Sequence, residues 1–551
     1  MMGATRGPVF GANGMVASSQ TAATQAGVDI LRRGGSAIDA AIATNAALSV
    51  IEPHMCGIGG DLFAIVWDPK QPGLVGLNAS GKSAAGLSTD ELRSCTSDEL
   101  MPGRGPLSMT TPGAVDGWCM LHDNYGELPL AEVLKPAREL AEHGTTIGLR
   151  TAAAWQEATR HLQADPLLNG LLEPFLATYS PNGKAPNAGD VFRNPALANT
   201  FRLLGEGGSA AFYQGEIAEK LVQYLTQVGA PFTADDFANN RAEWVQPVSS
   251  SYRGVDVFEL PPNGQGMSVL QMLNILEGFP LADFSRDDPR YWHVFLEAKK
   301  LAFEDRAVYF ADPAFYNSPS EALLAKDYAN TRRSMIDLSR ASADYEAGNL
   351  PLPKSDTTYL CAADSNGLMV SLIQSIFSPF GAGLVPGDLG FALQSRGAGF
   401  NLSDNHPNCY APEKRPFHTI IPGFACRDGK PWFSFGVMGA DMQPQGQVQV
   451  LSNLIDFDFN PQAAGDAFRM RHDGGRQPNG RDMDAIGVTQ FEAGIDDKIV
   501  SALNQMGHRV IPQKSGIAGF MGGYQGIMRD DSRGVYIGAT ESRLDGMALG
   551  F

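Results

Sequence analysis

The sequence predicts a chain of mixed helix and strand, and three features of its pattern support this fold class. Residues 357–375 contain two strand-like runs joined by Ser-Asn-Gly at 365–367, which is the turn chemistry of a tight hairpin. Residues 105–330 carry apolar side chains mainly at helical spacing, between polar connections. A second hairpin pattern surrounds residues 530–534. The 551 residues are ample for a large core, and periodicity alone defines no more than this mixed class.

The N-terminal part is expected to form two helices between residues 20 and 50. The first ends in two arginines, which suit the negative end of a helix, and Gly34 follows them. Ser36 is the expected N-cap of the second helix, an Ala-rich segment that continues to Leu48. The segment MCGIGGDLFAIVWD then changes from a glycine-rich loop to a strand. No Lys-Ser/Thr pair follows its glycines, so we do not expect a phosphate-binding loop.

Six later segments complete the expected elements. Single helices are expected at 128–144, 217–229 and 267–279. Residues 451–470 are expected to form a helix, a turn and the start of another helix. Residues 495–513 are expected to form a helix that leads to a strand, and residues 524–543 the terminal hairpin. The segment at 267–279 is apolar enough to be a buried helix. Asp305 and Arg306 are expected to form a structural pair without a chemical role.

Charge and composition limit the partners and the compartment. Lys and Arg number 42 against 60 Asp and Glu, a net charge of −18, which argues against nucleic acid or an anionic membrane as a partner. No run of about 18 apolar residues occurs, and the N-terminus has no apolar export signal, so no membrane span or export is expected. The six cysteines lack CxxC spacing and suit free thiols. We expect a cytoplasmic protein, with a periplasmic or secreted location left open.

Motifs for several common chemistries are absent from the sequence. The nine histidines show no HExxH or HxH spacing and no CxxC pair supplies a zinc site, so neither a metal nor a cofactor is expected. No GxSxG nucleophile elbow occurs, which disfavours an α/β-hydrolase.

Thr357 stands where a polar, proline-punctuated segment meets the first strand of the hairpin. A Thr hydroxyl is a poor nucleophile unless a base lies beside it, and the α-amino group of the same residue, freed by backbone cleavage, is one such base. Its unperturbed pKa of roughly 7.7–8.0 leaves a neutral fraction near physiological pH. Taken alone, Thr357 and Thr358 are more simply β-branched strand residues, and only the wider pattern favours chemistry.

That wider pattern resembles the γ-glutamyltransferase family of N-terminal-nucleophile hydrolases. The blocks that carry the resemblance are residues 15–66, 252–279 and 297–313, then TTYLCAADSNG, FGAGLVPGDLGFAL, KRPFHTIIPG and GVMGAD, all in the family's order. They cover nearly the whole chain. The resemblance implies an α+β fold in which two sheets lie between two helical layers, the αββα four-layer sandwich.

The resemblance implies that the chain cleaves itself between Asp356 and Thr357. The Thr357 hydroxyl would attack the Asp356 carbonyl, and hydrolysis of the ester would leave a large subunit, 1–356, and a small catalytic subunit, 357–551, intertwined in one domain. The new N-terminal Thr would then attack a small-molecule amide, and water or an amine would resolve the acyl-enzyme. Thr358 is the competing nucleophile. Ser375 takes the place of a family Thr whose hydroxyl bonds the nucleophile's amino group. A dimer of these subunit pairs is left open.

An acyl-transfer site also needs donors for the developing oxyanion, and backbone N–H groups at a glycine-rich turn suit this task. In GVMGAD, Gly439 and Ala440 occupy the positions of a family Gly-Gly pair. Ala keeps the N–H but disfavours a positive φ, so the turn is expected to differ in detail. A purely structural turn at the end of a strand is the alternative.

The pocket for the acyl group is where the resemblance weakens. Ser80 stands where the family has an Arg that holds the substrate's α-carboxylate, and Gly399 replaces an Asp that holds its α-amino group. A pair of family serines is replaced by His418 and Thr419. The two lost anchors would each supply roughly 1.5–3 kcal/mol as charge-assisted hydrogen bonds. A γ-glutamyl head group is therefore poorly specified.

Other charged residues could bind a different acyl group. Arg396 lies in the loop expected to face the pocket, with Lys82, Arg415 and His418 as neighbouring candidates for a small carboxylate. A structural salt bridge is the alternative role for Arg415, and a hydrogen-bonded pocket histidine is the alternative for His418. The pattern resembles the branch with cephalosporin-type acylases and an oxamate-hydrolysing amidase.

Three hypotheses follow. The first is a self-cleaving Thr amidohydrolase or acyltransferase that acts on a small amide without a standard γ-glutamyl head group. The second is a γ-glutamyltransferase or glutathione hydrolase with a rearranged pocket. The third is an uncleaved, inactive relative that binds a ligand or only supports an assembly.

Overall fold

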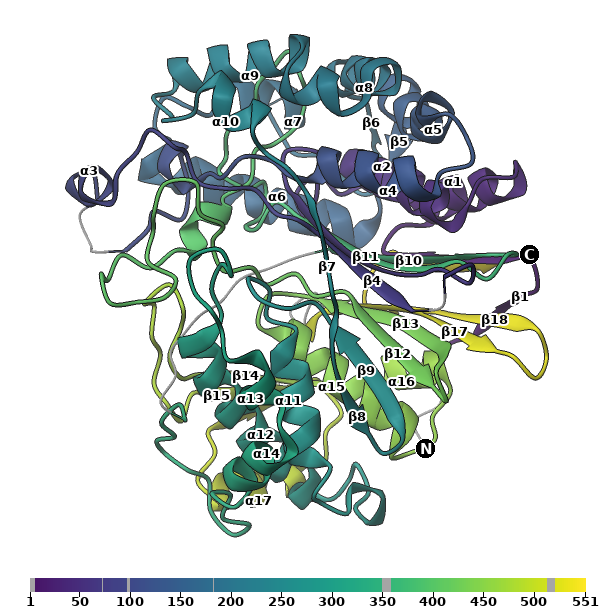
Figure 1. Ribbon diagram of the computed structural model, residues 1–551, viewed down its shortest axis with the longest axis vertical. Coiled ribbons are helices and arrows are strands. Elements are labelled where there is room, and N and C mark those ends of the chain that lie inside the picture. The colour runs from purple at the N-terminus through teal and green to yellow at the C-terminus, as the bar shows by residue number, and fades with distance from the viewer. Residues whose placement is uncertain (1–4, 72, 97–99, 182, 349–357, 513–520) are drawn as a thin grey trace.

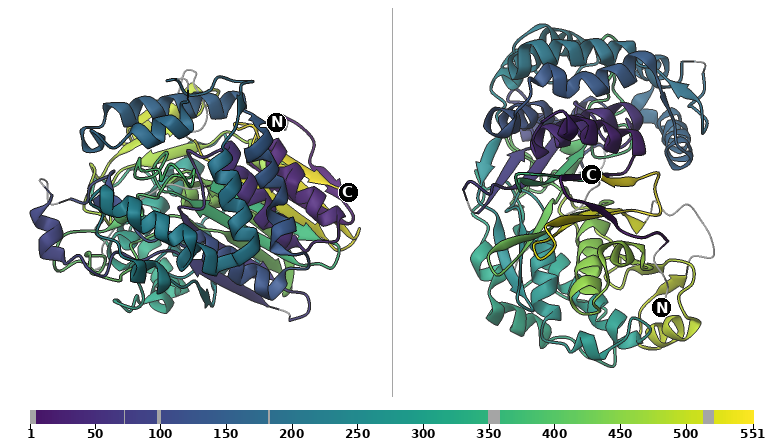
Figure 2. Two further views of the ribbon diagram at one scale, coloured as in Figure 1. Left: turned by 90° about the horizontal axis from the view of Figure 1, so that it is seen from above. Right: turned by 90° about the vertical axis from the view of Figure 1, so that its right-hand side faces the viewer.

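Two seven-stranded sheets stack face to face, and helices cover the outer face of each (Figure 1). The computed structural model describes residues 5–71, 73–96, 100–181, 183–348, 358–512 and 521–551. Seen from the side, the sheets lie in the middle, with one helical layer above and one below (Figure 2). This arrangement confirms the αββα sandwich and the α+β class.

The first sheet has the order β19-β2-β10-β11-β3-β4-β7. Its strands are β2 (Gly14–Ser18), β3 (Asp61–Trp67), β4 (Leu74–Ala79), β7 (Glu243–Val245), β10 (Thr358–Asp364), β11 (Met369–Ser375) and β19 (Met547–Gly550). The second sheet has the order β1-β18-β17-β13-β12-β9-β8. Its strands are β1 (Val9–Gly11), β8 (Val248–Tyr252), β9 (Val255–Glu259), β12 (Gly423–Arg427), β13 (Lys430–Met438), β17 (Gly523–Asp530) and β18 (Val535–Thr540).

The helices form two separate layers (Figure 1). On the side of the first sheet lie α1 (Thr21–Arg32), α2 (Ala37–Ile51), α4 (Ala114–Tyr125), α5 (Leu130–His143), α6 (Leu149–Ala164), α7 (Glu173–Tyr179), α8 (Pro195–Tyr213), α9 (Glu216–Gln227) and α10 (Ala234–Ala238). The short α3 (Thr89–Ser94) lies away from the sheets and packs through Leu92 on Phe400 and Tyr410. Against the second sheet lie α11 (Met267–Leu276), α12 (Pro289–Tyr309), α13 (Ser320–Leu324), α14 (Lys326–Arg333), α15 (Met442–Ile455), α16 (Pro461–Asp466) and α17 (Asp497–Gln505). A small two-stranded sheet pairs β5 (Thr145–Thr146) with β6 (Val191–Phe192). A small three-stranded sheet has the order β14 (Met470–Asp473), β15 (Val488–Phe491) and β16 (Val510–Pro512).

Local sequence signals explain the N-terminal helices. Ser36 accepts a hydrogen bond from the Asp39 N–H, and the Asp39 carboxylate accepts from the Ser36 N–H, which is a complete capping box. Gly34 follows α1 with φ of 88°, the left-handed conformation that glycine adopts without steric cost. Every residue of α2 is buried, and so is every residue of α11. The helix predictions for these segments are confirmed.

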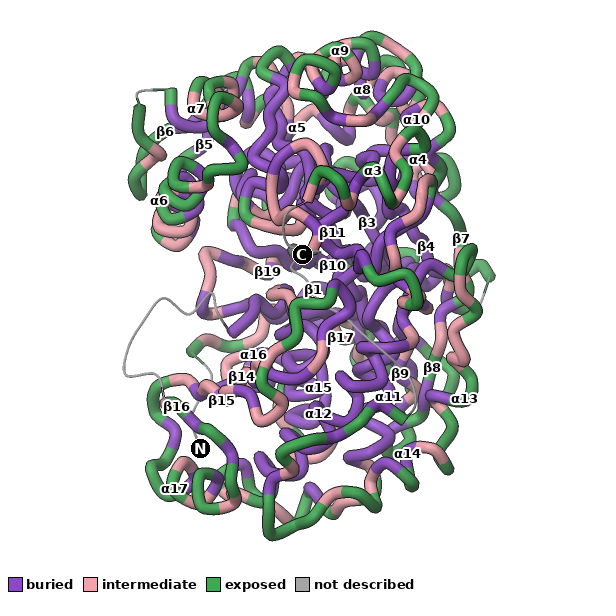
Figure 3. Tube along the Cα trace, turned by 90° about the vertical axis from the view of Figure 1, so that its left-hand side faces the viewer, coloured by how far each residue is buried: buried purple, intermediate pink, exposed green. Residues whose placement is uncertain are grey.

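The central hairpin is also confirmed. β10 pairs with β11 in antiparallel register from Thr358↔Gln374 to Ala363↔Met369. At the turn, the Asp364 carboxylate accepts from the N–H groups of Asn366 and Leu368, and Gly367 has φ of 89°. Buried apolar side chains fill the space between the sheets, and Figure 3 shows buried residues concentrated in the sheets and the adjacent helices. The hairpin is therefore held rigidly at the centre of the molecule.

Two expectations need correction. Within the region expected to be chiefly helical, residues 248–259 form the β8–β9 hairpin, whose five-residue strands at the edge of a sheet alternate in burial and are too short to stand out among helices. Asp305 and Arg306 do not pair with each other. Successive residues on a helix point about 100° apart, so Arg306 pairs with Asp441 at 2.8 Å and Asp305 with Arg332 at 3.2 Å.

Each large sheet contains strands that precede residues 349–357 in the sequence and strands that follow them. Residues 349–357 themselves lie outside the described part of the chain. β10 lies between β2 and β11, and β1 pairs with β18. Among the described helices, none is long and apolar enough to cross a membrane.

Candidate active site

The candidate active site lies where the central hairpin ends. Ser375 is the last residue of β11, and β10 begins at Thr358, opposite Gln374. Two residues of the sequence prediction, the nucleophile Thr357 and its neighbour Asp356, lie outside the described residues. The site is therefore built from the side chains around the described end of this strand pair.

A buried guanidinium connects three of the residues singled out in the sequence. Arg396, in a short 3-10 helix (Arg396–Gly399), donates from Nη2 to Ser375 Oγ at 3.0 Å and from Nη1 to Thr419 Oγ1 at 3.1 Å. Ser375 Oγ also accepts from the Phe377 N–H at 2.8 Å, and the guanidinium carbon lies 4.5 Å from the centre of the Phe377 ring. Arg396, Ser375 and Thr419 are completely buried. The structure thus brings a positive charge to the end of β11.

His418 lies beside this charge and is hydrogen-bonded at both ring nitrogens. Its Nε2 is 3.0 Å from Asp61 Oδ2, and its Nδ1 accepts from the Ile420 N–H at 3.3 Å. An acceptor at Nδ1 requires the proton on Nε2, so this network assigns the neutral tautomer. Burial, reinforced by Arg396, lowers the pKa of His418 to about 3 against the opposing effect of Asp61. These contacts favour the alternative of a hydrogen-bonded pocket histidine over a proton-transferring one.

Asp61 is a site residue that the sequence analysis missed. It begins β3, opposite Ser375, and is completely buried. Besides His418, its carboxylate accepts from the Gly81 N–H and from Gln394 Nε2, both at 2.9 Å. Its position in the sequence could have indicated this role, because an acidic residue between a glycine-rich loop and an apolar strand is expected to be buried. A buried charge is costly unless polar groups compensate it.

The predicted oxyanion turn joins β13 to α15. Gly439 has φ of 121° and Ala440 has φ of 56°, so Ala440 adopts the left-handed conformation despite its Cβ, at a cost of about 1–2 kcal/mol. The Gly439 carbonyl accepts from the Met442 N–H at 2.8 Å. Because a trans peptide points its N–H opposite to its carbonyl, the Ala440 N–H points away from α15. This orientation suits an oxyanion donor.

Two side chains that the sequence analysis did not assign to the site hold this turn. Gln265 donates from Nε2 to the carbonyls of Ala440, at 3.1 Å, and Thr419, at 2.9 Å. Arg306 donates to Gln265 Oε1 at 2.7 Å and to Asp441 Oδ1 at 2.8 Å. The brace links the turn to the Thr419 segment, so both sides of the site are fixed to each other.

The remaining predicted pocket residues have structural contacts. Ser80 donates to Asn78 Oδ1 at 2.7 Å and accepts from Asn263 Nδ2 at 3.2 Å. Arg415 donates to the Ser80 carbonyl at 2.9 Å and pairs with Glu243 at 2.8 Å, which favours its alternative role as a structural salt bridge. Lys82 lines a separate small cavity, whose lining does not include Arg396 but does include Asp235 and Asp236.

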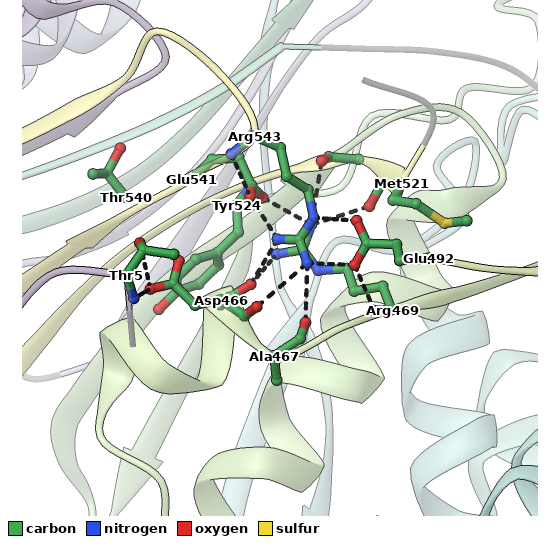
Figure 4. A network of polar contacts seen from close by, with 12 residues as sticks. Thr5, Asp466, Ala467, Arg469, Glu492, Met521, Tyr524, Thr540, Glu541 and Arg543 are labelled. Atoms are coloured by element: carbon green, nitrogen blue, oxygen red, sulfur yellow. Dashed lines mark hydrogen bonds and ion pairs between the residues drawn. The ribbon is translucent and has the colours of Figure 1, made fainter. Parts of the chain in front are cut away.

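A cavity of about 370 Å³ opens beside the oxyanion turn. Its lining residues are Glu52, His54, Met55, Arg150, Thr151, Ala154, Glu157, Met438, Gly439, Gly522, Gly523, Arg543 and Leu544. Figure 4 shows the polar network around the lining residue Arg543, in which Glu541 pairs with Arg469 at 2.8 Å and with Arg543 at 2.7 Å. Arg469 also donates to the Gly522 carbonyl at 3.2 Å. The network therefore fixes the glycine wall that contacts Gly439.

One group of described side chains has the composition of a metal site. His293, Glu297 and His508 are buried together, with His293 Nδ1 2.8 Å from His508 Nε2. However, the Lys300 ammonium donates to Glu297 Oε1 at 2.7 Å, and a fixed positive charge on a ligand oxygen disfavours a bound cation. His293 is also thirteen residues before Arg306 on α12, roughly 20 Å along the helix axis.

His418 predicts a pH dependence of stability. Its pKa is about 3 in the folded protein, against an ordinary value of 6.5, so between these values the unfolded chain binds a proton that the folded chain does not. The contribution of neutral His418 is complete above pH 6.5 and is lost as the pH falls toward 3. In a His418→Gln variant, the free energy of unfolding, measured by denaturant titration, is expected to depend less steeply on pH below 6.5, by up to about 1.4 kcal/mol per pH unit. Equal slopes for variant and wild type would contradict this reading of His418.

The stacked sheets between helical layers, with a buried polar cluster at the end of the central hairpin, define an N-terminal-nucleophile hydrolase fold. A crystal structure of a cephalosporin acylase from Bacillus halodurans matches with a TM-score of 0.91 and 40% identity, covering 100% of this chain and 98% of that chain. The chain belongs to the gamma-glutamyltranspeptidase family, whose model matches residues 23–551.

Two curated relatives extend this result. The glutathione hydrolase-like YwrD proenzyme of Bacillus subtilis is 36% identical over 543 residues, which cover 98% of this chain and 99% of the relative. The oxamate amidohydrolase proenzyme of Klebsiella pneumoniae is 33% identical over 547 residues, 98% of each chain. The resemblance seen in the sequence is confirmed, and the chain is an enzyme, a self-processing amidohydrolase of this family.

Proposed function

We propose that Thr357 is the nucleophile of this enzyme and that its substrate is a small amide whose acyl group carries a carboxylate, bound by Arg396. The observation that carries this proposal is the buried guanidinium of Arg396 between Ser375 and Thr419. A charge-assisted hydrogen bond contributes roughly 1.5–3 kcal/mol, enough to select a carboxylate over a neutral group. Glutaryl amides and oxamate, the monoamide of oxalate, carry such a group, and one relative is named as an oxamate amidohydrolase.

The γ-glutamyl alternative is weaker because nothing in the described pocket suits an ammonium group. Ser80 and Gly399 stand at the family's charged anchors, and the neutral His418 ring cannot replace them. The Asp61 carboxylate, which accepts from the N–H of Gly81, the residue after Ser80, is already hydrogen-bonded to three donors. A free α-amino group beside Arg396 would also be repelled.

The proposed reaction uses the residues around the hairpin end. The Thr357 hydroxyl attacks the amide carbon, its α-amino group takes the hydroxyl proton, and the Ala440 N–H stabilises the oxyanion. The C–N bond then breaks, the proton passes to the departing amine, and water hydrolyses the ester. Ser375 would orient the α-amino group. Gly439 gives the turn its conformation, and Thr419 holds Arg396 in place.

We propose cleavage into 1–356 and 357–551, with the two subunits staying together because each large sheet contains strands of both. A dimer of such pairs is the further oligomeric proposal. A reducing compartment such as the cytoplasm suits the six cysteines, all of which are free thiols. An unprocessed, inactive binding protein is the remaining alternative.

Denaturing electrophoresis and a panel of amides test this function together. The purified protein is expected to give two fragments, 1–356 and 357–551, with N-terminal sequencing of the smaller one starting at Thr357. Glutaryl anilide and oxanilate, the monoanilide of oxalate that keeps one free carboxylate, are expected to be hydrolysed faster than γ-glutamyl anilide. A single full-length band would favour the binding protein, and turnover of γ-glutamyl anilide alone would refute the role of Arg396.

A further inference from the structure

We propose that the 370 Å³ cavity beside Gly439 is the subsite for the departing amine, and that Arg150 makes it selective for amines that carry a carboxylate. This proposal rests on the proposed function. It concerns the half of the substrate that Arg396 does not contact.

The position of the cavity follows from the site's geometry. One wall is formed by Met438, Gly439 and Gly522, at the oxyanion turn. Met55 also lines the cavity, and its carbonyl accepts from the N–H of Ile376, the residue after Ser375, at 3.5 Å. The cavity therefore spans from the turn to the end of β11. An amide carbon with its oxygen at the turn and its acyl group toward Arg396 must direct its nitrogen to the other side.

Helix α6 supplies the charged side of the cavity. Arg150, Ala154 and Glu157 follow one another at spacings of four and three residues, which places them on one face of the helix. Arg150 and Glu157 are about 10 Å apart along the axis, at 1.5 Å per residue. The two charges therefore mark separate ends of this wall.

The guanidinium of Arg150 is available to a ligand. None of the ion pairs among the described residues involves it. The neighbouring Asp545 carboxylate accepts instead from the backbone N–H groups of Arg150, at 3.0 Å, and Thr151, at 3.1 Å. Glu52, another lining residue, accepts from Ser19 Oγ at 2.6 Å and from Gln20 Nε2 at 2.5 Å. Arg150 is half-buried, so a carboxylate there would be partly shielded from water.

The apolar lining residues indicate what the remainder of the departing amine is made of. Met55, Ala154, Met438 and Leu544 present apolar surface, which suits an aliphatic or aromatic ring. A volume of about 370 Å³ is at the lower end for small-ligand sites. The preferred leaving group is therefore a small ring or aliphatic amine with one carboxylate, such as an aminobenzoate.

Two substrates with one acyl group test the subsite. Glutaryl anilide and glutaryl 4-aminobenzoate differ only by a carboxylate on the leaving group. Wild-type enzyme is expected to show a lower KM for the aminobenzoate. In an Arg150→Gln variant, the KM for the aminobenzoate should rise by roughly 10–150-fold, the value of one charge-assisted bond, while the KM for the anilide stays within about twofold. Both substrates keep the carboxylate that Arg396 is proposed to bind.

Glu157→Gln is the matched control, because it removes the other charge from the same helix face and should not weaken binding of the carboxylate. Calorimetry of 4-aminobenzoate alone, titrated into mature wild-type and Arg150→Gln enzyme, supplies a readout without turnover and should show the same loss of affinity. An unchanged KM ratio and equal affinities in Arg150→Gln would overturn the subsite. Failure of wild-type enzyme to hydrolyse either substrate would instead overturn the proposed acyl specificity.

Discussion

Replacement of Thr357 by Ala is expected to abolish both self-cleavage and amide hydrolysis. Ala keeps the backbone amine but has no hydroxyl, so neither the ester with Asp356 nor the acyl-enzyme can form. Loss of a covalent nucleophile costs at least about 10³-fold in rate in comparable hydrolases. Denaturing electrophoresis should show one band of full length, and hydrolysis of a glutaryl anilide should fall to the background rate.

Thr358→Ala is the matched control for this experiment. Thr358 is the adjacent residue of the same type, and it begins β10. If Thr357 is the nucleophile, Thr358→Ala should still mature and retain activity. Normal maturation of Thr357→Ala, or a small subunit that begins at Thr358, would reassign the nucleophile.

Arg396→Gln is expected to remove most of the preference for a carboxylate in the acyl group. Gln can still bond one hydroxyl of Ser375 or Thr419, but it carries no charge. The kcat/KM for glutaryl anilide should fall by roughly 10–150-fold, the equivalent of 1.5–3 kcal/mol. For pentanoyl anilide, which has the same chain length without the carboxylate, kcat/KM should change only a few-fold. Steady-state kinetics of matured enzyme measure both.

Arg415→Gln gives a contrasting result. Arg415 pairs with Glu243 and donates to the Ser80 carbonyl, so its loss should lower the free energy of unfolding without changing the ratio of the two substrates. Equal losses for glutaryl and pentanoyl anilides in Arg396→Gln would show that Arg396 serves the fold rather than the substrate.

The elements that sequence analysis predicted well are those with strong local signals. Ser36 and Gly34 delimit α1 and α2, and the Ser-Asn-Gly turn fixes the central hairpin. The β8–β9 hairpin was missed because its strands are only five residues long and lie among helices, and only β9 is anchored to the rest of the sheet, by the distant strand β12. The layered architecture itself came from the resemblance to a family, since periodicity cannot say how sheets stack.

The site was predictable as a set of residues but not as a set of contacts. Arg396 is hydrogen-bonded to Ser375 and Thr419, which are 21 and 23 positions away in the sequence. His418 is hydrogen-bonded to Asp61, which is 357 positions away in the sequence. Such pairings depend on how strands and loops converge in three dimensions. The positive φ of Ala440 was unexpected for the same reason, because the brace of Gln265 and Arg306 that holds it comes from distant segments.

The interleaving of early and late strands has a consequence for how this enzyme can be made. β2 lies between β10 and β19, and β17 and β18 separate β1 from β13. A gene divided at position 357 would yield two polypeptides that each expose unpaired strand edges, which invite aggregation before they meet. One uninterrupted translation product solves this problem, because every strand finds its neighbour while the halves are still tethered.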